Sequence, residues 1–144
     1  MNRRGFTLIE LLLVMGLMAA LASIVITAIN PTRQLAGGKD AKRTADVNTI
    51  INAVYQYSID HAGNYPPTLL LGPARGICKT GVATCNNGID LDVLSGAYLV
   101  SIPVDPAASE TGTGTEYFIE RLVNGRLHVE APLAEGDNPI SVTR

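Results

Sequence analysis

The chain has 144 residues and a formal net charge of −2, and 47% of its residues are hydrophobic although only 5% are aromatic. This length suits one domain and excludes elaborate multidomain machinery. From Asn30 onward there are 9 Lys and Arg residues against 12 Asp and Glu residues. This mildly acidic balance argues against a nucleic-acid binder that works through bulk positive charge.

The hydrophobic excess is concentrated near the N-terminus. Residues 6–29 include 19 hydrophobic residues among 24 positions, and Glu10 is the one charged residue among them. As a helix this segment would extend about 36 Å, enough to cross ~30 Å of hydrocarbon. A carboxylate near the centre of a membrane helix costs roughly 2.5–3.5 kcal/mol, and less toward its end. We therefore expect a membrane helix over residues 6–30 in which Glu10 has a partner.

Two simpler interpretations of this segment leave Glu10 unexplained. A secretory signal peptide would use Arg3 and Arg4 as its basic region and the small residues at 20–23 as its cleavage site. Hydrophobicity continues beyond that site to Ile29, however, where a cleavage region should turn polar. A plain single-pass anchor is the second interpretation, and it also gives the glutamate no role.

Residues 4–10, Arg-Gly-Phe-Thr-Leu-Ile-Glu, precede an unbroken apolar run. This arrangement resembles the processing motif of type IV prepilins and type II secretion pseudopilins. The resemblance implies that a prepilin peptidase removes a leader of residues 1–5 by cutting after Gly5, and then N-methylates Phe6. It also implies that Glu10 faces the charged amine of Phe6 on a neighbouring subunit, so that the pair offsets the desolvation of both groups.

The resemblance predicts a structural subunit of a type IV pilus-like filament rather than an enzyme. The partners expected are further copies of the chain in a helical homopolymer, the prepilin peptidase, a membrane assembly machinery, and the lipid bilayer before assembly. A major pseudopilin of a type II secretion system is the alternative, and a secreted soluble binding module with an ordinary signal peptide is a further one. Nucleophile-elbow, zinc-protease and phosphate-loop motifs are absent from the sequence.

The resemblance also predicts where the chain resides. It places a single-pass subunit in the cytoplasmic membrane with its N-terminus in the cytoplasm, and later in a filament at the cell surface or in the periplasm. Basic residues flank the apolar run on both sides, and the positive-inside count alone favours the opposite orientation. The expected orientation therefore rests on the resemblance and on two downstream cysteines, which favour an oxidising compartment.

Residues 31–144 are expected to form an extracytoplasmic, pilin-like α+β domain, with the amphipathic half of a long helix packed on a small antiparallel sheet. Pro31 and Gly37-Gly38 either end the first helix, kink it or form a linker. From Asp40, as an N-cap, helical spacing predicts a second amphipathic segment that ends near Gly63. Its core-facing positions are Val47, Ile50, Ile51, Val54, and Tyr57 or Ser58, and its polar positions include Lys42, Arg43 and Asp46.

Residues 67–115 are rich in Gly, Pro, Thr and Ser, which predicts a long ordered loop with at most a short helix. Outside the cytoplasm Cys78 and Cys85 would form a disulfide, which stabilises by roughly 2–3 kcal/mol in the loop-entropy account. A zinc site is the rival interpretation, but the two histidines stand alone in the sequence. No cofactor is expected. Asp90, Asp92 and Asp105 are weak calcium candidates that are more simply solvated turn residues, since their spacing matches no calcium loop.

Asn124-Gly125 lies between two strand-like runs, 116–123 and 126–131, which predicts a hairpin with a two-residue type I′ turn. That turn would place Leu122 opposite Leu127 and Phe118 opposite Ala131. The predicted core face holds Phe118, Leu122, Leu127, Val129 and Ala131, with Glu120 as a misfit. The opposite face holds Tyr117, Ile119, Arg121, His128 and Glu130, with His128 as an exposed neighbour of Arg121. A last strand is expected at residues 140–142.

Overall fold

The computed structural model describes residues 5–136 and 138–144, so residues 1–4 of the expected leader lie outside the described residues. The chain divides into two units, with the boundary between Leu35 and Ala36. The first contains helix α1, Leu8–Ile29. Helix α2, Pro31–Asp60, begins in the first unit and belongs mostly to the second.

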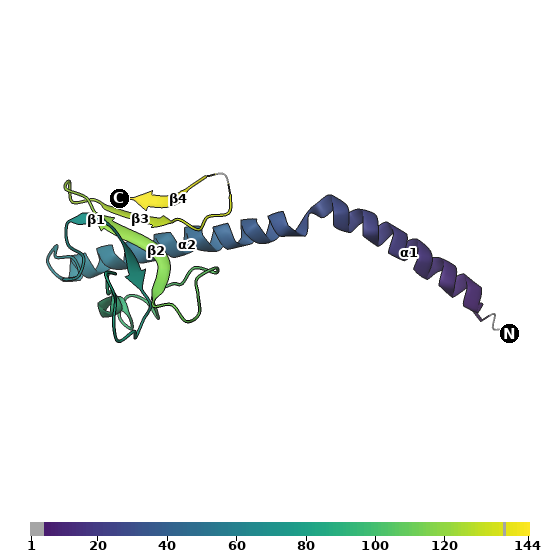
Figure 1. Ribbon diagram of the computed structural model, residues 1–144, viewed down its shortest axis with the longest axis horizontal. Coiled ribbons are helices and arrows are strands. Elements are labelled where there is room, and N and C mark those ends of the chain that lie inside the picture. Colours follow the sequence, from purple (N-terminus) through teal and green to yellow (C-terminus); the bar gives the residue numbers. More distant parts are fainter. Residues whose placement is uncertain (1–4, 137) are drawn as a thin grey trace. The chain divides into compact units, whose positions relative to one another are not determined.

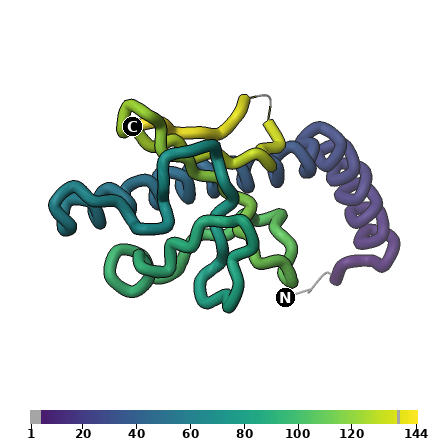
Figure 2. Tube along the Cα trace, turned by 60° about the vertical axis from the view of Figure 1, so that its left-hand side comes forward, coloured from purple at the N-terminus to yellow at the C-terminus, as the bar shows by residue number. Residues whose placement is uncertain are grey.

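The second unit is an α+β domain in which α2 lies against a four-stranded antiparallel sheet (Figures 1 and 2). The strands are β1 (Gly72–Cys78), β2 (Gly114–Arg121), β3 (Leu127–Ala131) and β4 (Ile140–Thr143), in the spatial order β1-β2-β3-β4. A short 3₁₀ helix spans Asp92–Leu94. The predicted fold class, a long N-terminal helix with an amphipathic half on a small antiparallel sheet, is confirmed.

The core lies between α2 and the sheet, and the helical spacing predicted its helix side. Val47, Ile50, Ile51 and Val54 are all fully buried, and Tyr57 is 7% exposed. The sheet side consists of alternate residues of two central strands, and the 89–102 segment closes the remaining edge. These contributors are Tyr117, Ile119, Leu127, Val129, Ile89, Leu91, Leu94 and Ile102.

The amphipathic helix begins at Pro31, so the prediction of a start at Asp40 is wrong. Proline suits the first helical position because its missing N–H would have no helical partner there. Gly37 and Gly38 lie inside the helix and are exposed. Each glycine costs about 1 kcal/mol relative to alanine within a helix, which weakens a helix without ending it.

The expected long loop over residues 67–115 contains a strand, β1, that the sequence analysis missed. β1 pairs with β2 through an interrupted register, with shifts between Gly72 and Arg75 and between Gly76 and Cys78. On its other side, the Cys78 N–H donates to the Ile89 carbonyl at 3.0 Å, and the Ile89 N–H donates to the Gly76 carbonyl at 2.8 Å. This segment contains glycine and proline and pairs irregularly, so its apolar and polar residues do not alternate as in a regular strand. The sequence pattern therefore did not indicate a strand here.

The β2–β3 hairpin is present, but its predicted register is wrong by one residue. Arg121 pairs with Leu127 and Phe118 with Glu130. The Gly125 N–H donates to the Leu122 carbonyl at 2.9 Å, and the Leu122 N–H to the Arg126 carbonyl at 2.8 Å. The turn is therefore a three-residue loop in which only Gly125, at φ +81°, is left-handed, rather than a type I′ pair.

The one-residue shift inverts the faces of β2, because side chains alternate along a strand. Tyr117 and Ile119, predicted to face outward, are fully buried, whereas Phe118 and Leu122 are half-buried on the outer face. Glu120 joins them there, which removes the misfit of the predicted register. The predicted faces of β3 and the last strand at β4 agree with the structure.

The inverted face yields a stability prediction. Ile119→Ala should lower the free energy of unfolding by about 2–5 kcal/mol, because it removes a fully buried side chain from the core. Phe118→Ala removes a larger side chain from a half-buried position and should cost less. Urea denaturation of the full chain in detergent micelles would compare the two, and a larger loss for Phe118→Ala would contradict the register.

Candidate functional site

Helix α1 is an apolar helix with no buried side chain among its residues. It has 22 residues, and Glu10 is the one charged residue among them. At ~1.5 Å per residue it is about 33 Å long, which matches the ~30 Å hydrocarbon thickness of a bilayer. It is the one helix in the described part of the chain that is long and apolar enough to cross a membrane.

The residues of the expected cleavage motif lie at the start of α1. Gly5, Phe6 and Thr7 precede the helix, and Phe6 is 83% exposed. Thr7 is the N-cap, and its Oγ1 accepts the Glu10 N–H at 3.3 Å. Glu10 therefore lies in the first turn of α1, where a carboxylate interacts favourably with the positive end of the helix dipole.

Asn30 separates the two helices and caps both of them. Its backbone is left-handed at φ 48° and ψ 79°, which ends α1. Its side-chain Oδ1 accepts the Thr32 hydroxyl at 2.7 Å and the Arg33 N–H at 3.5 Å, at the start of α2. The sequence pattern predicted a break at Pro31, whereas asparagine supplies the left-handed residue and proline supplies the following first helical position.

Within the second unit, Arg43 forms a buried ion-pair cluster. Its side chain is fully buried, contrary to its predicted place on the polar face of the helix. Nε donates to Asp105 Oδ2 at 2.7 Å and Nη2 to Asp105 Oδ1 at 3.0 Å, which is a bidentate pair. Nη1 donates to Asp40 Oδ1 at 2.8 Å. The cluster joins α2 to the turn that precedes β2.

Asp40 extends the cluster to the loop between β3 and β4. Its two carboxylate oxygens accept the Glu135 N–H at 3.0 Å and the Gly136 N–H at 2.8 Å. Lys39 Nζ donates to Glu135 Oε1 at 2.8 Å on the exposed side of this cluster. Asp40 is therefore a tertiary contact of α2 rather than its N-cap.

The ionised forms of these groups are favoured in the folded state. The Glu135 N–H and the Arg43 guanidinium hold the pKa of Asp40 below its ordinary value. Burial raises the pKa of the Asp105 carboxyl, but hydrogen bonds from Arg43 and from the Ala107 N–H outweigh burial and lower it. The hydrogen bond to Asp105 raises the pKa of Arg43. The cluster is thus fully charged at neutral pH.

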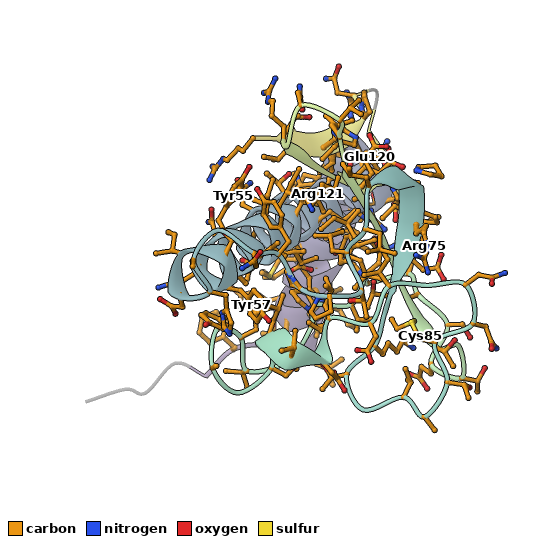
Figure 3. All side chains as sticks on the ribbon, turned by 90° about the vertical axis from the view of Figure 1, so that its left-hand side faces the viewer. Tyr55, Tyr57, Arg75, Cys85, Glu120 and Arg121 are labelled. Atoms are coloured by element: carbon orange, nitrogen blue, oxygen red, sulfur yellow. A yellow bond between two sulfur atoms is a disulfide. The ribbon has the colours of Figure 1, made fainter. Side chains whose placement is uncertain are left out.

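The two cysteines form a disulfide between β1 and the loop that follows it (Figure 3). Their Cα atoms are 5.8 Å apart. Gly88 packs against the bridge so closely that a Cβ there would lie 2.6 Å from the Cys78 Sγ. The disulfide therefore fixes the segment that contains Ile89, whose backbone hydrogen-bonds to β1 on the edge that faces away from β2.

The three weak calcium candidates do not form one site. Asp90 Oδ1 accepts the Asp92 N–H at 2.8 Å, and Asp92 Oδ2 accepts the Gly81 N–H at 2.8 Å. Asp105 is 3% exposed and bonded to Arg43, so its interpretation as a solvated turn residue is wrong. Within residues 5–136 and 138–144, no group of three or more Asp, Glu, His or Cys side chains could hold a metal ion.

His128 lies on the outer face of β3, but its predicted neighbour is wrong. The observed register pairs it with Glu120 and Thr143 instead of Arg121. Its Nδ1 lies 2.7 Å from the Thr143 Oγ1, and its Nε2 lies 3.7 Å from Glu130 Oε2. Arg121 instead lies over the Tyr65 ring, with its Cζ 4.6 Å from the ring centroid.

Three residues that shape these sites were not predicted in these roles: Thr7, Asn30 and Arg43. Two of them carry a signal. Thr7-x-x-Glu10 is a capping-box pattern, and an asparagine directly before a proline is a common helix boundary. A buried arginine has no local sequence signal, because its partner Asp105 lies 62 positions away.

The Arg43–Asp105 pair yields a pH-dependent prediction. Asp105→Asn should lower the free energy of unfolding at pH 7 by about 3 kcal/mol, because it leaves Arg43 buried without an ionised partner. A carboxyl whose folded pKa is depressed stabilises above its unfolded pKa of ~3.9, and this contribution is lost as the pH falls through the folded value. The difference between wild type and variant should therefore shrink as the pH is lowered from ~5 toward 2.

The matched control replaces both partners together. Arg43→Met/Asp105→Leu removes both charges and should be far less destabilising than Asp105→Asn, since well-packed apolar pairs often equal a buried ion pair. Urea denaturation of the full chain in micelles across pH measures all three proteins. A constant difference between wild type and Asp105→Asn from pH 7 to pH 2 would refute the assignment.

Comparison with known proteins bears on the N-terminal region. Residues 1–26 match the family model described as the prokaryotic N-terminal methylation motif. No curated protein and no solved structure matches the chain. The matched residues include Gly5, Phe6 and Glu10, the three that carried the resemblance. The N-terminal region of the chain thus carries the cleavage and methylation motif found in type IV pilins and pseudopilins.

Proposed function

We propose that the chain is a structural subunit of a type IV pilus-like filament, cut between Gly5 and Phe6 and polymerised through α1. The observation that carries the proposal is an apolar 22-residue helix, with no buried side chain, that starts directly behind the methylation motif. Such a helix is unfavourable in water. Lipid covers it before assembly, and the apolar helices of other copies cover it in the filament.

Glu10 sets the axial register of the filament in this proposal. It is the one charged side chain among the residues of α1. An unpaired carboxylate surrounded by apolar helices carries a desolvation penalty. The methylated amine of Phe6 on a neighbouring copy is the complementary charge, and the two groups meet only when the copies are correctly offset.

The second unit forms the exterior of the filament. Its disulfide fits an oxidising compartment outside the cytoplasm, so the N-terminus before α1 lies on the cytoplasmic side. The subunit is held in the cytoplasmic membrane until the assembly machinery extracts it. Its function is assembly rather than catalysis, and no cofactor takes part.

A major pseudopilin of a type II secretion system is the second candidate, since pseudopilins share the motif at residues 1–26. Gene neighbourhood discriminates between the two. A neighbouring outer-membrane secretin with secretion partners would favour the pseudopilus, whereas a retraction ATPase would favour the pilus.

The mature N-terminus tests the proposal directly. Mass spectrometry of the membrane-embedded and filament-incorporated protein should find a chain that begins at N-methylated Phe6. A chain that begins at Ser23 would indicate ordinary signal-peptide cleavage and a secreted soluble module, and it would overturn the proposal.

The register role of Glu10 is tested by Glu10→Ala. We expect membrane insertion to be unchanged or improved, because a costly carboxylate leaves the apolar segment, while incorporation into filaments falls at least tenfold, or ~1.4 kcal/mol per contact. Glu110→Ala is the matched control, because it removes an exposed carboxylate from the loop before β2. Sheared filaments quantified against the membrane fraction provide the measurement, and normal filament yield from Glu10→Ala would refute the role.

A further inference from the structure

We infer that Thr7 is a positioning residue for proteolytic processing, because it fixes the start of α1 and keeps the scissile carbonyl of Gly5 outside the helix. The inference rests on the proposed function, since it presupposes cleavage between Gly5 and Phe6. It assigns a specific role to a residue between the cleaved bond and the glutamate of the motif.

The geometry at the start of α1 supports this role. Thr7 has an extended backbone at φ −80° and ψ 150°, and its Oγ1 accepts the Glu10 N–H. Its own carbonyl accepts the Leu11 N–H at 3.2 Å, which is the first hydrogen bond of helical spacing at this end. Gly5 and Phe6 precede this bond and are exposed and non-helical.

Two features of the sequence place the helix start at Leu8. Threonine is a preferred N-cap residue, and glutamate three positions later completes the capping-box pattern. Glu10 also places a negative charge in the first turn, where the helix dipole is positive. Both features would be lost or misplaced if the helix began earlier.

The next suitable N-cap upstream is Gly5, since glycine is only slightly worse than threonine at this position. With its N-cap at Gly5, the helix would include Phe6, and the Gly5 carbonyl would accept the Ile9 N–H just as Thr7 accepts Leu11. The backbone around the Gly5–Phe6 bond would then be helical, and its carbonyl oxygen would already be occupied.

Cleavage acts on that same carbonyl. Hydrolysis adds one water across the Gly5–Phe6 peptide bond, leaving a carboxylate on Gly5 and an ammonium group on Phe6. The peptidase must polarise the Gly5 carbonyl and place water against its carbon. The cap at Thr7 leaves this carbonyl before the helix, on exposed non-helical backbone, so less free energy is needed to unwind the substrate before attack.

The experiment measures initial cleavage rates of the full chain in liposomes by a prepilin peptidase. Thr7→Ala should lower kcat/KM about fivefold, which corresponds to the ~1 kcal/mol of a lost N-cap. Thr7→Ser and Thr7→Asn retain a cap and should be cleaved at close to the wild-type rate. Thr27→Ala is the matched control, because the Thr27 hydroxyl bonds within the body of the same helix, to the Ile24 carbonyl at 2.9 Å.

A spectroscopic measurement separates capping from direct contact with the peptidase. In lipid nanodiscs without the peptidase, the ¹³C carbonyl shift of Gly5 should move toward its helical value in Thr7→Ala and stay unchanged in Thr7→Ser. Cleavage of Thr7→Ala at the wild-type rate would overturn the inference. Slow cleavage of this variant with an unchanged Gly5 carbonyl shift would also overturn it.

The failure of this inference is distinct from failure of the proposed function. If the wild-type chain is cut after Gly5 but all three Thr7 variants are cleaved at the same rate, only the inference falls. If the wild-type chain is not cut there, both fall.

Discussion

The uncovered apolar surface of α1 is the constraint on which the rest of the molecule depends. None of its 22 residues is buried within its own unit, and in the proposed function lipid or other copies cover it. The hydrophobic core of the second unit contains none of these residues. The core is built instead from the second part of the helical region, beginning at Arg43, and from the sheet. The helical region thus has two parts: α1, which contributes nothing to the domain core, and α2, which forms one side of it.

The second unit compensates for its modest size with specific connections at the edges of its core. The Arg43 cluster connects α2 with the Asp105 turn and with the loop before β4. At a different edge, the disulfide and Gly88 hold the 85–89 segment against β1. Buried ion pairs contribute little net free energy when whole but are costly when half is removed. The cluster therefore specifies which loops lie beside α2 more than it stabilises the fold.

The sequence predicted the features whose signals are local. A 3.6-residue period identified Val47, Ile50 and Ile51 as core, and Asn124-Gly125 identified a hairpin. Prediction from the sequence failed where contacts between residues far apart in the chain determine the structure. Arg43 was assigned to solvent because helices usually expose arginine, and its partner is distant in the chain. The hairpin register failed because a three-residue turn and a two-residue turn share the same Asn-Gly signal, although they place opposite faces of β2 in the core.

In the proposed function, processing itself changes the electrostatics of the helix start. Before cleavage, Phe6 carries a neutral amide; after it, an ammonium group stands two residues before Leu8, beside the positive end of the helix dipole. That position is unfavourable for a cation, and transfer toward apolar surroundings makes it more so. Glu10 of the same copy is committed to the first turn, so relief comes most fully from a carboxylate on another copy. The proposed cleavage therefore does more than trim the chain, because it creates the charge that the proposed assembly neutralises.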